Sequence, residues 1–162
     1  MPSIDHLRHM YVYHFDTTVR LMDLAENLGE ADYHQDPGYG RGSIHALVLH
    51  ILNADRGWRI GLETGKRPQS LAAEDHADLA SLREVLAAER VAWETMLAGL
   101  TAEQVDEDVE ISAGPGYALS ISRWKILHHV LFHGMQHHAE IAQCLSEKGQ
   151  AVGDIDFFFY TQ

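Results

Sequence analysis

Four long stretches of the chain carry apolar residues at every third or fourth position, which is the spacing of amphipathic helices. They cover about residues 3–28, 44–63, 78–100 and 122–148. Gly29 follows the first stretch, and Ser43 stands directly before the second, where its side chain can cap the first turn of a helix. The pattern therefore predicts four helices, each with one apolar side.

The connections between these stretches complete the predicted fold. Residues 36–42 form a loop by composition, and the second connection, residues 64–77, is long enough to allow a crossover. Before the last helix, apolar residues alternate around Gly114-Pro115-Gly116, which predicts a short β-hairpin; they are Val105, Val109, Ile111, Tyr117, Leu119 and Ile121. We therefore expect an all-α protein, a four-helix bundle with a crossover connection and a short β-hairpin before the last helix. Its length suits one domain, residues 1–162.

Charge and hydropathy argue against two classes of partner. The formal net charge is −12, from 24 acidic residues against 12 Lys and Arg, and it would repel a phosphate backbone. No segment has the length of an apolar membrane span, and the N-terminus lacks the pattern of a signal peptide. We therefore expect a cytoplasmic protein with no nucleic-acid or membrane partner. The single cysteine, Cys144, can form no internal disulfide, so nitrogen and oxygen atoms would hold any metal.

Twelve histidines are the main candidates for chemistry, and five of them fall within residues 128–138. His129, His133 and His137 follow one another at intervals of four residues, so they share one side of the predicted helix. His133 and His137 lie on the apolar side of that helix, and His50 lies on the apolar side of the second helix. These last three histidines therefore point toward the core of the bundle.

A shared metal would remove the cost of burying three imidazoles, which is about 1–3 kcal/mol for each one without a partner. Histidines one turn apart can both reach one ion through bonds of about 2.0–2.1 Å. We therefore predict that His50, His133 and His137 bind one divalent transition metal. The alternatives are core histidines with hydrogen-bond partners or a solvated helix face. Eight other histidines are expected at the surface or in local hydrogen bonds: His6, His9, His14, His34, His45, His76, His128 and His138.

Two more residues lie near the predicted ligands. His129 would be a fourth ligand, a residue that supports a ligand or a cavity wall, of which support is favoured. Glu140, nearly one turn after His137, would orient an imidazole, complete a set of two histidines and one carboxylate, act as a base, or form an ordinary salt bridge. Both are candidate site residues, whereas Cys144 lies about 10 Å along the helix from His137 and is expected in the core.

Several segments together form a recognisable pattern. Ser43-Ile44 is followed by His50, and the run Leu127-His128-His129-Val130-Leu131-Phe132-His133 is followed by His137-His138. The stretch 55–58 and the ending 153–160 extend this pattern over nearly the whole chain. The pattern resembles the DinB/YfiT-like superfamily. The chain departs from it at His138-Ala139-Glu140, where many members read Arg-Gly-Gln.

The resemblance implies a four-helix bundle, commonly a dimer, with three metal-binding histidines that correspond here to His50, His133 and His137. The family name refers to the induction of a founding member by DNA damage and implies no binding to DNA. Related members include thiol-dependent enzymes: transferases that use bacillithiol or mycothiol, and a mycothiol-dependent maleylpyruvate isomerase.

By this resemblance we expect a metal-dependent enzyme of the thiol S-transferase type that acts on a small electrophile, with a low-molecular-weight thiol as cofactor. A hydrolase-like enzyme is an alternative, because a divalent ion lowers the pKa of a bound thiol and of bound water alike. Further alternatives are a non-catalytic metal-binding stress-response protein and a metal-free dimeric bundle. Zinc is the first choice of metal, with nickel, iron or copper next. The expected partners are a small-molecule substrate and a second copy of the chain in a homodimer.

Overall fold

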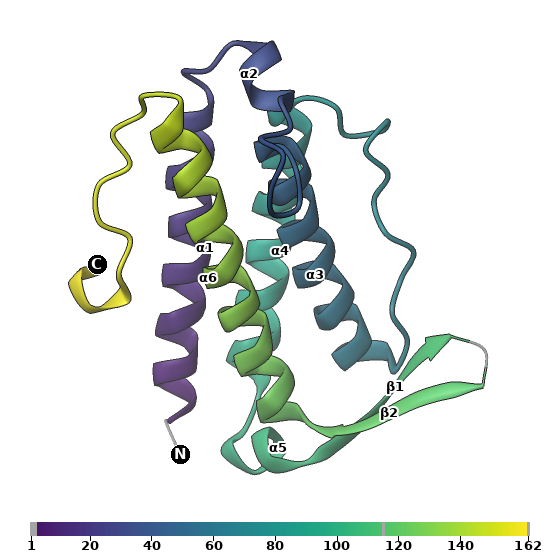
Figure 1. Ribbon diagram of the computed structural model, residues 1–162. Coiled ribbons are helices and arrows are strands. Elements are labelled where there is room, and N and C mark those ends of the chain that lie inside the picture. Colours follow the sequence, from purple (N-terminus) through teal and green to yellow (C-terminus); the bar gives the residue numbers. More distant parts are fainter. Residues whose placement is uncertain (1–2, 115, 162) are drawn as a thin grey trace.

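The four long helices of the computed structural model form a bundle (Figure 1). The structure describes residues 3–114 and 116–161. The long helices are α1 (Ile4–Ala25), α3 (Ile44–Thr64), α4 (Leu79–Gly99) and α6 (Arg123–Glu147). An antiparallel hairpin of β1 (Asp108–Gly114) and β2 (Tyr117–Ser122) precedes α6. The predicted fold class is confirmed.

Side-chain caps and one glycine set the ends of the long helices. The backbone N–H of Ala46 donates to the Ser43 hydroxyl at 3.2 Å, as the position of Ser43 predicts. Asp78 caps α4 in the same way, by accepting from the N–H of Ser81 at 2.7 Å. Gly65 ends α3 with a left-handed backbone, at φ 72°, which other residues rarely adopt.

Each long helix packs mainly against two others, and the pairs α1 with α3 and α4 with α6 lie across the bundle from each other. Helices α1 and α6 run in one direction, whereas α3 and α4 run in the other (Figure 1). Because α3 and α4 are parallel, the segment 65–78 that joins them returns along the length of the bundle. This segment is the predicted crossover connection.

Polar contacts attach the crossover segment to its neighbours. The Asn53 amide donates to the Leu71 carbonyl at 3.2 Å, and the Leu71 N–H donates to Asn53 Oδ1 at 2.7 Å. Nη1 of Arg56 donates to the carbonyl of Gln69 at 2.9 Å. The start of the segment bonds to β1. The segment therefore forms a fixed wall beside α3.

Three short elements in the described part of the chain lie outside the predicted ones: α2 (Glu30–His34), α5 (Ala102–Asp106) and the 3-10 helix η1 (Phe157–Phe159). Helix α5 contains Val105, so the prediction that placed this residue in the hairpin is wrong. Thr101 and Gln104 form a capping box, in which each side chain bonds to the other's backbone. This local chemistry starts a helix where the alternation of apolar residues alone suggests a strand.

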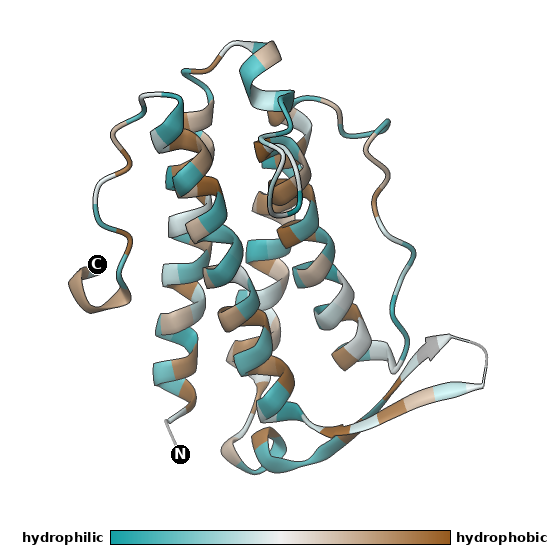
Figure 2. Ribbon diagram, in the orientation of Figure 1, coloured by the Kyte–Doolittle hydropathy of each residue, from teal (hydrophilic) through white to brown (hydrophobic). Residues whose placement is uncertain are grey.

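The core lies between the four long helices, and hydrophobic and hydrophilic residues alternate around each of them (Figure 2). Tyr11, Phe15 and Trp93 are among its fully buried side chains. Gly61 of α3 has no side chain, which lets Ile111 of the hairpin pack closely against the helix. None of the helices in the described residues combines the length and hydrophobicity that a membrane span requires.

Candidate metal site

His50, His133 and His137 meet in the interface between α3 and α6. His50 comes from the second turn of α3, and His133 and His137 lie one turn apart in the middle of α6. Their ligating nitrogens all lie within 4.8 Å of one another. The fold therefore brings the three predicted ligands together, although His50 and His133 are 83 residues apart in the sequence.

The three Nε2 atoms suit a shared cation better than they suit hydrogen bonds. His133 Nε2 lies 2.9 Å from His50 Nε2 and 3.2 Å from His137 Nε2. A ring nitrogen has either one N–H or one lone pair in the ring plane, so His133 Nε2 cannot satisfy both neighbours. Bonds of about 2.0–2.1 Å from imidazoles to a tetrahedral ion place the nitrogens about 3.3 Å apart, close to these spacings. A divalent cation fits this donor set.

Glu140 holds His137 in the orientation that metal binding requires. The Oε2 atom of Glu140 lies 3.0 Å from Nδ1 of His137, whose side chain is buried. Because a carboxylate accepts, Nδ1 donates and Nε2 keeps its lone pair for a metal. Among the interpretations open for Glu140, this geometry matches the orientation of an imidazole.

The other two predicted ligands, His50 and His133, are neutral near pH 7. Burial lowers the pKa of His50 from 6.5 to about 4, and the positive charge of Arg41 adds to the effect. Burial also lowers the pKa of His133 to about 4, with further contributions from the neighbouring histidines. Both rings therefore have a lone pair available for a metal without first losing a proton.

The loop before α3 covers one side of the cluster. Gly40, with φ 63°, lies beside Glu140: a Cβ atom added to it would be 3.6 Å from Oε2 of the carboxylate. Tyr39 donates to Glu147 of α6 at 2.7 Å, which ties the loop to that helix. The exposed Arg41 side chain follows directly. The loop therefore places a cation at the edge of the site.

A hollow of about 270 Å³ opens beside His50. Arg41, Leu49 and Asn53 are among the residues that line it. A small molecule can therefore approach His50 from solvent. Three protein ligands with an accessible side are typical of catalytic metal sites, whereas structural sites are usually closed by a fourth ligand.

His129 lies at the exposed rim of the cluster. Its ring centroid is 5.7 Å from that of His133 and 5.4 Å from that of Trp58. His129 is not part of the set of converging nitrogens found among the described residues. Its geometry matches a residue that packs beside the ligand His133 and not a fourth ligand.

A buried polar cluster next to the metal site was not anticipated. The expectation of a surface position or a local hydrogen bond is wrong for His14 and His138, which are 1% and 0% exposed. It is also wrong for His45, which is 6% exposed and whose Nε2 lies 2.7 Å from the distant His76 carbonyl. His14 Nε2 lies 3.0 Å from Asp55 Oδ2, and Thr18 Oγ1 lies 2.8 Å from His138 Nε2. His14 follows Leu7 by seven residues on the apolar side of α1, and this position is the signal that predicts its burial.

Comparisons with solved structures agree with this fold. YfiT from Bacillus subtilis, described as a probable metal-dependent hydrolase with an unusual four-helix bundle topology, is 16% identical, with a TM-score of 0.73 over 93% of this chain and 92% of YfiT. The DinB-like protein YjoA from Bacillus subtilis is 17% identical, with a TM-score of 0.66 over 94% of this chain and 97% of YjoA. At these identities the similarity shows the fold alone.

The sequence comparisons give one match. No curated protein sequence matches the chain significantly. The model of the DinB family matches residues 2–162, which is almost the entire chain. This protein therefore belongs to the DinB family.

Proposed function

We propose that this protein is a metal-dependent enzyme of the thiol S-transferase type, which joins a small thiol through its sulfur to an electrophilic small molecule. The observation that carries the proposal is the convergence of three imidazole Nε2 atoms beside an accessible hollow. Zinc is the metal we propose, because three histidines with an open position are typical of catalytic zinc sites. Nickel, iron and copper are the alternatives.

Each residue of the site would have a separate role. His50, His133 and His137 would hold the ion, and Glu140 would keep Nδ1 of His137 protonated. When bound, a divalent ion with three neutral ligands lowers the pKa of a thiol or water that joins it. Arg41 at the edge of the site would attract an anionic substrate or leaving group.

The position of Glu140 favours a thiol over water as the nucleophile. A cysteine-like thiol has a pKa of about 8.5, whereas that of bulk water is far higher. Hydrolysis would therefore profit more from a nearby base. Glu140 uses Oε2 to hold His137, and its charge partly offsets the lowering of the pKa of His50. Thiol transfer needs no such base, so we place it before hydrolysis.

The proposed reaction is a substitution at an electrophilic carbon. The thiolate sulfur forms a carbon–sulfur bond, the leaving group departs with the electron pair of the bond that breaks, and the thiol proton passes to solvent. With 1-chloro-2,4-dinitrobenzene as the electrophile, chloride is released and a coloured thioether forms. The rate is measured with zinc-loaded, untagged protein after subtraction of the uncatalysed reaction.

Parallel assays separate the alternatives. We expect thioether formation to require thiol, metal and His133, and to survive His128→Ala, because the His128 Nδ1 bonds within its own helix to the Trp124 carbonyl at 2.7 Å. Hydrolysis of p-nitrophenyl acetate without thiol would instead favour the hydrolase. A metal-loaded protein that is inactive in both assays would favour a non-catalytic metal-binding stress protein. The homodimer stays a prediction, which light scattering checks.

A further inference from the structure

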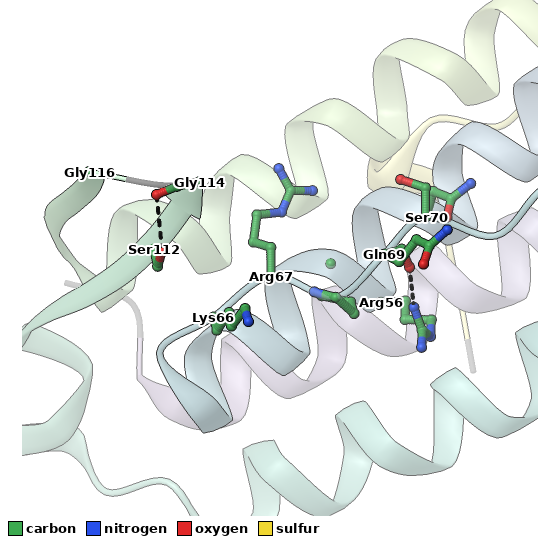
Figure 3. Close-up of a pocket in the computed structure, with 11 residues that line it drawn as sticks. Arg56, Lys66, Arg67, Gln69, Ser70, Ser112, Gly114 and Gly116 are labelled. Atoms are coloured by element: carbon green, nitrogen blue, oxygen red, sulfur yellow. Dashed lines mark hydrogen bonds between the residues drawn. The ribbon is translucent and has the colours of Figure 1, made fainter.

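A basic pocket of about 630 Å³ lies between α3, the crossover segment and the β-hairpin (Figure 3). Its lining includes Arg56, Lys66 and Arg67, together with polar side chains such as Gln69 and Ser70. Among the described residues that line it there is no Asp or Glu. The whole chain has twice as many acidic residues, 24, as Lys and Arg, 12. This local excess of positive charge favours an anion.

The cationic side chains of this pocket form no ion pairs with carboxylates of the described residues. Five other arginines pair with carboxylates: Arg8, Arg59, Arg83, Arg90 and Arg123. No such pair is formed by Arg56, Lys66 or Arg67 within residues 3–114 and 116–161. A guanidinium presents a planar fork of donors that matches carboxylate and phosphate. The two arginines are therefore available to an oxyanion from outside the chain.

Both arginines are held in place by their surroundings. The guanidinium carbon of Arg67 lies 4.6 Å from the centroid of the Trp58 ring. Its nitrogens rest against Gly57, where a larger residue would displace them. Arg56 is fixed by its bond to the carbonyl of Gln69. Figure 3 shows Arg67 between this pair of residues and the β-hairpin. Oriented donors lose less conformational freedom when a ligand binds.

The pocket adjoins the histidine cluster. Asn53 lines both this pocket and the hollow beside His50. Gly57, in the pocket wall, follows His50 by seven residues, which corresponds to about 10 Å along a helix axis. From the other side, the Trp58 ring contacts the ring of His129 at the rim of the cluster. The pocket and the hollow beside His50 are therefore neighbours along α3.

We propose that Arg56 and Arg67 bind an oxyanion group, a carboxylate or a phosphate, of a small molecule whose reactive end lies at the three histidines. The proposal rests on the proposed function, because it assigns the other end of the ligand to the metal site. The expected ligand is an anion whose charged group lies about 10 Å from its reactive atom. Lys66 adds positive charge through a more flexible side chain.

Two thiols of equal length test this assignment. 8-Mercaptooctanoate ends in a carboxylate and 8-mercaptooctanol in a neutral hydroxyl. With cobalt(II)-loaded protein, calorimetry measures the affinity of each thiol, and the near-ultraviolet absorption of a cobalt thiolate reports sulfur at the metal. The variants are Arg56→Gln, Arg67→Gln and their combination. Arg90→Gln is the matched control, since Arg90 pairs with Asp16 on the α1–α4 side of the bundle.

The expected result is that wild type and Arg90→Gln bind the carboxylate about tenfold more tightly than the alcohol, and that the pocket variants lose most of this preference. Stronger competition by inorganic phosphate than by acetate would identify phosphate as the preferred group, and the reverse would identify carboxylate. Equal affinity of wild type for the two thiols, or a preference that survives the double substitution, overturns the proposal. A preference that depends on the arginines without any cobalt thiolate absorption supports the pocket and contradicts the proposed thiol chemistry.

Discussion

The Oε2 atom of Glu140 lies 3.0 Å from Nδ1 of His137, so a carboxylate outside the set of ligating nitrogens determines which nitrogen of His137 faces the other two histidines. A Cβ atom added to Gly40 would lie 3.6 Å from the same oxygen, so the absence of a side chain there leaves room for the carboxylate. One of the three predicted ligands therefore has a supporting contact, and this contact can be removed without removing a predicted ligand.

Glu140→Gln is expected to weaken zinc binding about 10–100-fold, because the neutral amide is a poorer acceptor for the Nδ1 proton of His137. Competition with a chromophoric chelator measures the affinity. Glu94→Gln is the matched control, because Glu94 pairs with Arg90 on α4, away from the site. An affinity of Glu140→Gln equal to that of wild type would show that the contact does not support the metal.

The metal-free protein is expected to lose stability as the pH falls from about 6.5 to about 4. Burial lowers the pKa of His50 and His133 to about 4 in the folded state, from 6.5. The unfolded chain therefore binds more protons than the folded one in this window, and the free energy of unfolding falls as pH falls. Urea titrations across the window measure the slope. Double substitution of both histidines by Gln should flatten it, and an unchanged slope would contradict the assignment.

Asp55→Ala is expected to destabilise the protein by about 3 kcal/mol, because it leaves the buried His14 ring without its partner. Asp55→Asn keeps an acceptor of similar shape and should cost less. Urea unfolding gives the free energies, with Asp75→Ala in the exposed crossover segment as control. If Asp55→Ala were no more destabilising than Asp75→Ala, the buried pair would have no role in stability.

Gly134→Ala is expected to cost about 1–3 kcal/mol, which is the usual effect of overpacking. A Cβ atom on Gly134 would overlap the imidazole ring of His14, which is itself buried between α1 and α6. Gly99→Ala is the control, because no atom lies within 4 Å of the methyl group that it adds. Thermal unfolding should show a lower Tm for the first variant only; equal Tm values would mean that α6 shifts to accommodate the methyl group.

Local signals account for the parts of the fold that the sequence predicts. The apolar stripes mark the four long helices, and the caps Ser43 and Asp78 lie at the starts of α3 and α4. The directions of the helices do not follow from local signals. The length of the segment 65–78 allows a crossover, but the path of this segment is what makes α3 and α4 parallel. Contacts distant in sequence, such as Asn53 with Leu71, fix that path. Helix α5 was missed because the capping box at Thr101 outweighs the alternation of apolar residues.

In the candidate site, too, local spacing predicts some residues, whereas contacts that depend on the folded structure determine the others. His133 and His137 are predictable because one turn of helix separates them on an apolar stripe, and His50 because it lies on another. The contact that Glu140 makes depends on its side-chain conformation, which spacing alone leaves open among several roles. Arg67 was not predicted, since its position depends on a ring and a glycine of α3 that the crossover brings beside it.

The metal content of the untagged protein tests the central claim most directly. Plasma mass spectrometry compares wild type with alanine variants of His50, His133 and His137, and with His128→Ala as a control on the same helix as two of the ligands. The account predicts about one divalent transition metal per chain in wild type and in His128→Ala, and loss of the ion in each of the three ligand variants. A wild-type protein that folds fully without metal, or ligand variants that keep it, would contradict the assignment and favour a bundle whose histidines are ordinary core residues.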